Sequence, residues 1–387
     1  MDKKTIALHT PYERRDAYDS LAVPVYNNVA FEFDNAAVMS DAFCNRISAP
    51  DYTRVENPTV TQLERRVQAV TGAAAVTALN TGMAAISNAL LAVVKAGANI
   101  VTSVHLFGNT FSLITTTLAR LGVQVKLCDL TNPALVEEAV NGDTCCIFLE
   151  ILTNPQLEVA DLSALSKIAR RHNIPLMADS TMIPFTETRL KDLGVDVEIV
   201  SSTKYLSGGG TSLGGLVIDY GSFSGISDRI KLELLFNLGA YMNPQAAYMQ
   251  TLGLETLDAR YQRQASNALE LARRLKGLVK VNYPGLEDNP YYELSRRQFG
   301  PTSGAMLTLE LESPEACFRF IDKLKLIHRA TNLFDSRSLA IHPASTIFGN
   351  FPPEDLPGMG VKQTVIRLSV GLEDVEDLFL DIQQALQ

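Results

Sequence analysis

Cysteine is scarce in this chain. Five cysteines occur among 387 residues, with no CxxC spacing and no histidine at the spacing of a metal ligand. An odd number of scattered cysteines does not make a disulfide framework, and the apolar runs around Cys128, Cys145 and Cys146 are typical of small buried side chains. The sequence therefore predicts neither disulfides nor a metal site.

Basic clusters and long apolar runs are also missing. The formal net charge is −9 and the pI is about 5.2, with no group of neighbouring lysines and arginines. This charge balance argues against nucleic acid and anionic membranes as partners. The opening segment MDKKTIALHTPYERRD has no apolar leader core, and no apolar run is long enough to span a membrane. We expect a cytoplasmic protein without membrane association.

The common nucleotide-binding loops are absent as well. The glycine-rich segment SGGGTSLGG, at 207–215, lacks the GxGxxG spacing and leads into a strand-like run rather than a helix. No GxxxxGK[ST] segment occurs, which argues against an NTPase. These glycines favour either a close approach of the backbone to a cofactor or a simple turn.

What the chain does contain is a regular alternation of strand-like and helix-like segments. Strands are predicted at 73–79, 99–104, 123–128, 144–150, 174–178, 195–200 and 213–219, with amphipathic helices between most of them. This alternation predicts an α/β fold with a mostly parallel sheet and helices on both faces. We expect an N-terminal arm over 1–55, a large domain over 56–249 and a smaller α/β domain over 250–387. A long helix at 246–276, broken near Gly253, would link the two domains.

Polar residues follow two neighbouring predicted strands, and they form the chemical centre of the sequence. Asp179 ends one apolar run, and Lys204 follows the next. In a parallel sheet both would lie at one edge. Such a pair suits pyridoxal phosphate (PLP), which needs an amine for a Schiff base and an acid that keeps its pyridine nitrogen protonated. A capping aspartate and a solvated lysine are the structural alternative, which these two residues alone do not exclude.

A second feature is an anion site predicted at a helix start. Thr81 lies between a predicted strand and helix, so the backbone N–H groups of Gly82 and Met83 would point off the helix N-terminus toward a phosphate. Ser201 and Thr203, beside Lys204, could add hydroxyl groups. A threonine cap followed by a turn glycine explains the same residues equally well.

Two arginines are candidate anion receptors. Arg367 lies in the strand-like run at 364–370, where a charge needs either an ion-pair partner or a substrate carboxylate. Tyr52 and Arg54 would project from the same side of an extended segment, as in a phosphate or carboxylate clamp. A surface pair is the alternative for these two residues.

Several motifs occur in the order found in one enzyme family. They are YTRVENPT (52–59), NTGMAA (80–85), LFGNT (106–110), EILTNP (150–155), ADST (178–181), SSTKY (201–205), SLAIHPAST (338–346) and IRLSVGLED (366–374). On these motifs the chain resembles, from about Leu21 to its end, the PLP-dependent enzymes of Cys/Met metabolism. That family includes cystathionine γ-synthase, cystathionine γ-lyase, methionine γ-lyase and O-acetylhomoserine sulfhydrylase.

The resemblance implies a PLP-dependent transferase fold (fold type I) and a role for each matching residue. Lys204 would carry the cofactor, Asp179 would contact the pyridine nitrogen and Asn154 the ring hydroxyl. Arg367 would bind the substrate carboxylate, with Asn332 or Ser338 nearby. The implied phosphate contacts are Thr81, Gly82, Met83, Ser201 and Thr203. Tyr52 and Arg54 would reach the site of a neighbouring copy, so the chain would be a homo-oligomer with shared active sites, typically a tetramer.

The chain departs from the family at some positions. Phe107 stands where a tyrosine usually stacks on the cofactor ring; a phenylalanine still stacks but has no hydroxyl for proton transfer. Thr81 replaces the common serine, and Ser180 the common asparagine. Ile347 and Phe348 replace the usual Thr-His after the HPAST motif.

Phe107 also bears on the predicted reaction. A carboxylate, with a conjugate-acid pKa of about 4, leaves without protonation, whereas a thiolate, at about 8.5, benefits from an acid. The segments ATNLFDSRSLAIHPAST and GGGTSLGG also resemble O-acetylhomoserine sulfhydrylases. We therefore expect γ-replacement on an O-acyl-homoserine by sulfide or a small thiol, in sulfur amino-acid metabolism and methionine biosynthesis. A PLP-dependent γ-lyase and a non-catalytic PLP-binding regulator are the alternatives.

Overall fold

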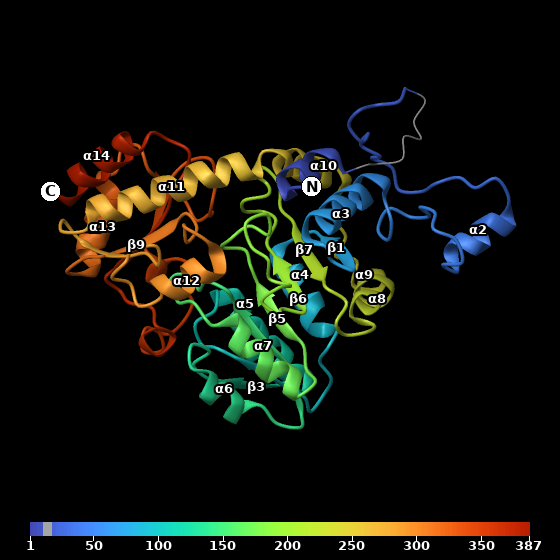
Figure 1. Cartoon of the computed structure of the whole chain (residues 1–387), viewed down its shortest axis with the longest axis horizontal. Helices are drawn as coiled ribbons and strands as arrows, with labels where there is room; N and C mark the ends of the chain where they lie inside the picture. The colour runs from blue at the N-terminus through green and yellow to red at the C-terminus, as the bar shows by residue number, and fades with distance from the viewer. Residues whose placement is uncertain (11–17) are drawn as a thin grey trace.

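Two sheets joined by helices make up the molecule. The computed structural model describes residues 1–10 and 18–387. The larger sheet lies at the centre of Figure 1, the smaller C-terminal sheet at the left, and the segment with α2 extends to the right. Part of the predicted arm, residues 11–17, lies outside the described residues.

The larger sheet has seven strands in the order β1-β7-β6-β5-β4-β2-β3. Neighbouring strands from β3 through β6 are parallel, and β7 is antiparallel to both β6 and β1. The predicted, mostly parallel α/β fold is thus confirmed, and the strands are β1 (Ala75–Leu79), β2 (Asn99–Thr102), β3 (Gln124–Leu127), β4 (Thr144–Glu150), β5 (Leu176–Asp179), β6 (Val197–Val200) and β7 (Gly215–Asp219).

Both faces of this sheet are covered, because alternate residues of a strand point to opposite sides. On β4, Ile147 and Leu149 pack into one hydrophobic cluster, while Cys146 and Phe148 pack into another. The central strands therefore appear in the sequence as continuous apolar runs. The covering helices include α3 (Pro58–Thr71), α4 (Gly82–Leu91), α5 (Gly108–Ser112), α6 (Pro133–Ala139) and α7 (Leu162–Arg171).

Helix starts in this part of the chain follow from their capping residues. The side chains of Asn57, Thr81, Asn132 and Asp161 each accept a backbone N–H of the helix that follows. This contact satisfies one of the N–H groups that an α-helix leaves without a partner at its first turn. The predicted helix at 110–121 begins as α5 and continues through a π-helical stretch, Leu113–Leu118, and a 3-10 turn, Ala119–Leu121.

The second sheet has the order β10-β11-β12-β9-β8. Its strands are β8 (Lys280–Asn282), β9 (Met306–Glu310), β10 (His328–Arg329), β11 (Leu339–Ile341) and β12 (Val365–Ser369), accompanied by α12 (Tyr292–Phe299), α13 (Pro314–Lys323) and α14 (Val375–Leu386). The sequence did not predict the short strands β10 and β11 or helix α12.

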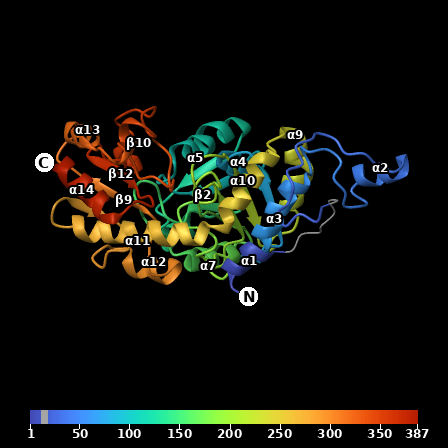
Figure 2. The same ribbon diagram turned by 90° about the horizontal axis from the view of Figure 1, so that it is seen from above.

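Two consecutive helices, α10 (Pro244–Glu255) and α11 (Leu257–Leu275), connect the sheets, and Figure 2 shows α11 running from α10 along the C-terminal part of the molecule, where it packs against β8 and β9. The predicted break is present, but it falls at Thr256, between the two helices, and Gly253 itself lies inside α10. A Cβ on Gly253 would lie 1.8 Å from the Leu206 carbonyl oxygen, so the glycine permits a close helix contact. The predicted domain boundary at 249/250 also falls inside α10.

The N-terminal arm was predicted to be extended, but its described part contains helices. Helix α1 (Lys3–His9) packs against α3 and α10, and the Lys3 ammonium donates hydrogen bonds to the carbonyls of Phe185 and Thr188. Helix α2 (Ala36–Phe43) projects from the body of the molecule (Figure 1). Two further short helices, α8 (Ile226–Arg229) and α9 (Leu235–Leu238), follow β7. None of the described helices has the length and apolar character needed to cross a bilayer.

Candidate active site

A cavity of about 320 Å³ lies where β4, β5 and β6 of the larger sheet end, and residues of the second sheet line its other side. The structure brings ten of the predicted site residues together around it. They are Thr81, Gly82, Met83, Phe107, Asn154, Asp179, Ser201, Thr203, Lys204 and Arg367.

Asp179 and Lys204 meet in this cavity because β5 and β6 are parallel neighbours. Burial and the nearby charge of Arg367 lower the pKa of Lys204 to about 8, although Asp179 opposes the shift. About a tenth of the amine is therefore unprotonated and nucleophilic at pH 7, far more than for a lysine of ordinary pKa. Burial raises the pKa of Asp179, while hydrogen bonds from Thr181 and the charge of Lys204 oppose that rise. A cation placed against Asp179, such as a protonated ring nitrogen, would favour its ionised form.

Helix α4 points its N-terminus into the cavity. The Thr81 side chain accepts the N–H of Ala84, whereas the N–H groups of Gly82 and Met83 precede the first intrahelical hydrogen bond. A Cβ on Gly82 would lie 2.6 Å from the side chain of Ser201, so only glycine lets the two segments approach this closely. Thr203 shares hydrogen bonds with the backbone of Gly214, which fixes the turn beside the lysine. These groups form a cradle suited to a phosphate.

Phe107 and Asn154 enter the cavity from two loops, after β2 and β4. Phe107 is the residue before α5 and is half-buried. Asn154 is buried, and its side-chain oxygen accepts a hydrogen bond from the Arg367 guanidinium at 3.2 Å. Ile347, one of the departures from the family pattern, also lines the cavity, while its neighbour Phe348 is fully buried in a small apolar cluster.

Arg367, on β12 of the second sheet, is buried at 2% exposure. Its guanidinium donates to Asn154 and to the carbonyls of Thr331 and Asn332, and its Nε has no partner among the described residues. No carboxylate in the described part of the chain forms an ion pair with it. Burial lowers its pKa to about 9, which leaves it protonated at neutral pH. A buried cation without an anion fits a carboxylate receptor better than a structural salt bridge.

The two predicted neighbours of Arg367 take different positions. The side-chain oxygen of Asn332 accepts a hydrogen bond from the Lys204 ammonium at 3.1 Å, so Asn332 adjoins the reactive amine. Ser338 is buried away from the cavity, where its backbone and side chain bond to Glu373 and Gly371. Within one chain, Ser338 supports a turn rather than lining the cavity.

Tyr52 and Arg54 do not reach this cavity within one chain. Tyr52 is 41% exposed, and the Arg54 guanidinium lies 5.4 Å from the centre of its ring. Arg54 also donates a hydrogen bond to the Phe236 carbonyl. The two side chains therefore lie together on the same side, as expected, but on the surface of the molecule.

Sequence reasoning missed several residues that line the cavity, and Glu150 is the one with a titratable group. Glu150 ends β4 and pairs in register with Asp179 on β5. Glu150 ends an apolar run in the sequence, and the same kind of signal identified Asp179. The other missed lining residues are Ile86, Thr181, Met182, Leu213, Thr331, Leu333 and Ile347.

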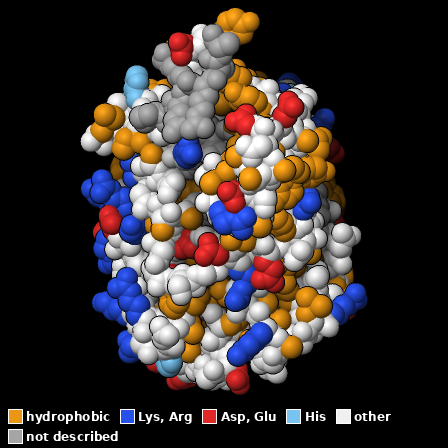
Figure 3. Space-filling model, turned by 90° about the vertical axis from the view of Figure 1, so that its right-hand side faces the viewer, with side chains coloured by type: hydrophobic (Ala, Val, Ile, Leu, Met, Phe, Trp, Pro, Cys, Tyr) orange, Lys and Arg blue, Asp and Glu red, His pale blue; other side chains and the backbone are white. Residues whose placement is uncertain are grey.

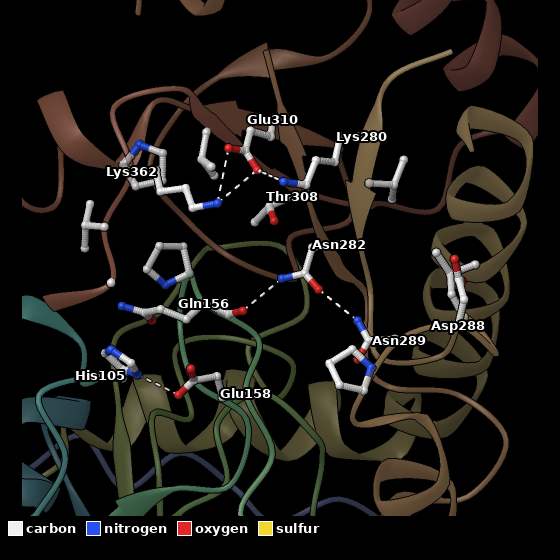
Figure 4. Close-up of a pocket in the computed structure, with 18 residues that line it drawn as sticks. His105, Gln156, Glu158, Lys280, Asn282, Asp288, Asn289, Thr308, Glu310 and Lys362 are labelled. Carbon is white, nitrogen blue, oxygen red and sulfur yellow. Dashed lines mark hydrogen bonds and ion pairs between the residues drawn. The ribbon is translucent and has the colours of Figure 1, made fainter. Parts of the chain in front are cut away.

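A second cavity, of about 470 Å³, lies between the second sheet and loops of the larger domain, and Pro155 and Gln156 are on its wall (Figure 4). Its charged groups are paired. Glu310 binds both Lys280 and Lys362, at 2.7 and 3.1 Å, and His105 bonds to Glu158 at 2.6 Å. This cavity is larger than the first, but it has neither a buried unpaired cation nor a free helix N-terminus on its wall.

The residues of the first cavity fit an aldehyde cofactor with a phosphate. Lys204 would attach it, Asp179 would face a ring nitrogen, and the α4 N-terminus would hold the phosphate. Arg367 remains free for the carboxylate of an amino-acid substrate. The fold and the cavity together define the class of protein: a fold type I enzyme that uses pyridoxal phosphate.

Comparison with known proteins gives the family. A model of the "Cys/Met metabolism PLP-dependent enzyme" family matches residues 4–387, and the chain belongs to this family. An L-methionine γ-lyase of Fusobacterium nucleatum is 37% identical over 99% of this chain and 97% of its own length. An O-acetyl-L-homoserine sulfhydrylase of Leptospira meyeri is 34% identical over 99% of this chain and 96% of its own length.

A solved structure is similar throughout. It is that of a proposed O-acetylhomoserine (thiol)-lyase from Campylobacter jejuni, which carries N'-pyridoxyl-lysine-5'-monophosphate. It has a TM-score of 0.96 and 33% identity, with 100% of each chain covered. The predicted family, fold and cofactor are thereby confirmed, while relatives of two activities match at similar identity.

Proposed function

We propose that this enzyme replaces the acyl group of an O-acyl-homoserine, such as O-acetylhomoserine, by sulfide or a small thiol, giving homocysteine or a thioether. The observation that carries the proposal is Phe107 on the cavity wall, where the chain offers a ring without a hydroxyl. An acetate leaving group, with a conjugate-acid pKa of about 4, needs no proton donor, whereas a thiolate, at about 8.5, does.

The roles of the other residues follow from their environment. Pyridoxal phosphate, when bound, supplies an electron sink for negative charge at the substrate Cα. Lys204, with its lowered pKa, takes the Cα proton, and Asn332 orients its amine. Arg367 holds the α-carboxylate by charge-assisted hydrogen bonds, since its guanidinium has no anionic partner in the part of the chain that the structure describes. Asp179 keeps a positive charge at the ring nitrogen.

A γ-lyase is the second candidate, because the match to methionine γ-lyases is as extensive as the match to sulfhydrylases. A lyase would use the same cavity, and water would take the place of the incoming thiol.

A substrate screen decides between the two. Purified protein with PLP would be given O-acetylhomoserine with sulfide, and separately methionine and cystathionine, with thioether, thiol and oxo-acid products assayed together. We expect homocysteine from the first mixture at a kcat/KM at least about 10-fold above that for either thioether. Preferential release of oxo acid from methionine or cystathionine would contradict the replacement activity and support the lyase. If none of these substrates is turned over, the result would support the alternative of a non-catalytic PLP-binding regulator.

We also propose that Tyr52 and Arg54 act in the cavity of a neighbouring copy. The side of the molecule that carries α2 exposes many apolar side chains (Figure 3), including Met39, Phe43 and Leu238. Such a surface fits an interface between copies.

Complementation tests this assembly. Lys204→Ala and Arg54→Ala proteins would each be inactive, yet a co-expressed mixture would recover about a quarter of the wild-type activity, because half of the dimers hold one intact site. A mixture as inactive as its components would contradict the shared site.

A further inference from the structure

Glu150 is the buried acid of the cavity to which no role has been assigned. Its side chain accepts a hydrogen bond from the backbone N–H of Phe107 at 2.6 Å. The backbone N–H of Asn154 also interacts with its carboxyl group. On the neighbouring strand, Asp179 is its register partner. One side chain therefore contacts the two loops that carry Phe107 and Asn154 and lies next to the acid that faces the cofactor ring.

We propose that Glu150 is a positioning residue: it anchors the loops of Phe107 and Asn154 around the cofactor ring while leaving the negative charge at this sheet edge on Asp179 alone. Two carboxylates at the ends of adjacent strands, both buried, do not ionise together at low cost. Asp179 gains a cationic partner from the cofactor, whereas the contacts of Glu150 on the loops are neutral backbone N–H groups. Of the pair, Glu150 is therefore the acid that keeps its proton.

The charges around Glu150 agree with this division. Lys204 and Arg367 lie across the same cavity, on the side of the bound cofactor and substrate. On its other side, Glu150 borders a void of about 10 Å³, enough for one water, together with His105 and Glu158. These two bond to each other (lower left of Figure 4), so His105 is already paired and gives Glu150 no free counter-charge. Burial and then Asp179 raise the pKa of Glu150 to about 8, and the hydrogen bonds from the Phe107 and Asn154 backbone N–H groups oppose this rise without cancelling it.

Two substitutions distinguish the charge of the Glu150 side chain from its shape and hydrogen bonding. Glutamine copies the neutral acid and still accepts the Phe107 N–H through its carbonyl, whereas alanine leaves that N–H unpaired. We expect Glu150→Gln to retain kcat/KM within about 3-fold at pH 7, and Glu150→Ala to lose about 10-fold or more, because an orphaned buried donor is costly. Glu158→Gln, which alters the acid on the far side of the void, serves as the matched control.

The pH profile is the sharper measurement. In the wild type, ionisation of Glu150 above pH 8 adds a second anion beside Asp179, so kcat/KM declines and the visible spectrum of the bound cofactor changes. In Glu150→Gln this alkaline decline is absent or displaced upward by at least about one pH unit. The Glu158→Gln control keeps the wild-type decline.

Unfolding of the cofactor-free protein gives a readout that does not depend on turnover. Because the folded-state pKa of Glu150 lies above its unfolded value, its contribution to stability is present below the unfolded pKa and is lost as pH rises through the folded one. Between about pH 5 and pH 9 the Tm of the wild type should fall further than that of Glu150→Gln, with most of the difference arising below pH 8. Two results would overturn the proposal and make Glu150 an ionised carboxylate whose charge is required. One is a loss of kcat/KM at pH 7 as large in Glu150→Gln as in Glu150→Ala. The other is an equal fall of kcat/KM and of Tm with rising pH in the wild type and in Glu150→Gln.

Discussion

The two cavities of this molecule differ in how their charges are satisfied. In the cofactor cavity, Arg367 is buried with no anionic partner among the described residues, and there the Lys204 amine hydrogen-bonds only to a neutral amide oxygen. In the larger cavity of Figure 4, Glu310 takes two lysines, and His105 takes Glu158. A buried charge without a partner costs stability, and such a charge is retained where a ligand supplies the missing partner. Volume alone would have pointed to the wrong cavity.

The largest difference in activity between the two cavities should come from removing one lysine of each, Lys204 or Lys280. Lys204→Ala removes the attachment amine and proton acceptor, so activity should fall by about 10³-fold or more. Lys280→Ala, in the second cavity, should change activity by less than about 2-fold. Borohydride reduction of the coloured wild-type protein, followed by peptide mapping, should label Lys204. A label on another residue would remove the basis for assigning the cofactor to this cavity.

Removing the unpaired arginine should have the next largest effect. Arg367→Ala should lower kcat/KM by roughly 30- to 5000-fold, mainly through KM, because a buried charge-assisted contact is worth about 2–5 kcal/mol. The charge of Arg367 also helps to lower the pKa of Lys204, so its loss should raise that pKa and move the acidic limb of the pH profile upward. Arg319→Ala, in an exposed ion pair, is the control. An unchanged KM would place the carboxylate receptor elsewhere.

A moderate effect is expected from restoring a hydroxyl in the cofactor cavity. Phe107→Tyr should raise turnover of methionine or cystathionine by about 10-fold, because a phenol can protonate the departing thiolate, while O-acetylhomoserine turnover changes by less than about 3-fold. The ratio of the two activities, measured with one protein preparation, reports the change. A parallel change for both substrates would mean that leaving-group protonation does not limit thioether cleavage.

The smallest effect is expected in the paired cavity. Burial would raise the pKa of Glu310, but the hydrogen bonds from Lys280 and Lys362 outweigh it, so the net shift is downward. Its stabilising contribution is therefore present above the unfolded pKa and lost as pH falls. Glu310→Gln should cost less than about 1 kcal/mol of unfolding free energy at pH 7 and leave activity unchanged. A loss of activity would give this cavity a functional role.

Much of the fold and the cavity was predictable for one physical reason. Strands buried on both faces are continuous apolar runs, so a polar residue at the end of such a run, as with Asp179, is visible in the sequence. The same reasoning should have identified Glu150. The exact position of the helix break, at Thr256, could not be predicted, because Gly253 looks like the break until its contact with Leu206 is known. For Tyr52 and Arg54, the predicted location requires a second copy of the chain.

The amine and the guanidinium belong to different sheets, Lys204 following β6 and Arg367 on β12. An amino-acid ligand bound at both Lys204 and Arg367 therefore connects the two halves of the molecule. Occupancy should reduce their independent motion and slow proteolytic nicking at the exposed α10–α11 junction at Thr256. Digestion rates with and without a non-reactive amino acid would then measure binding with no chemistry taking place.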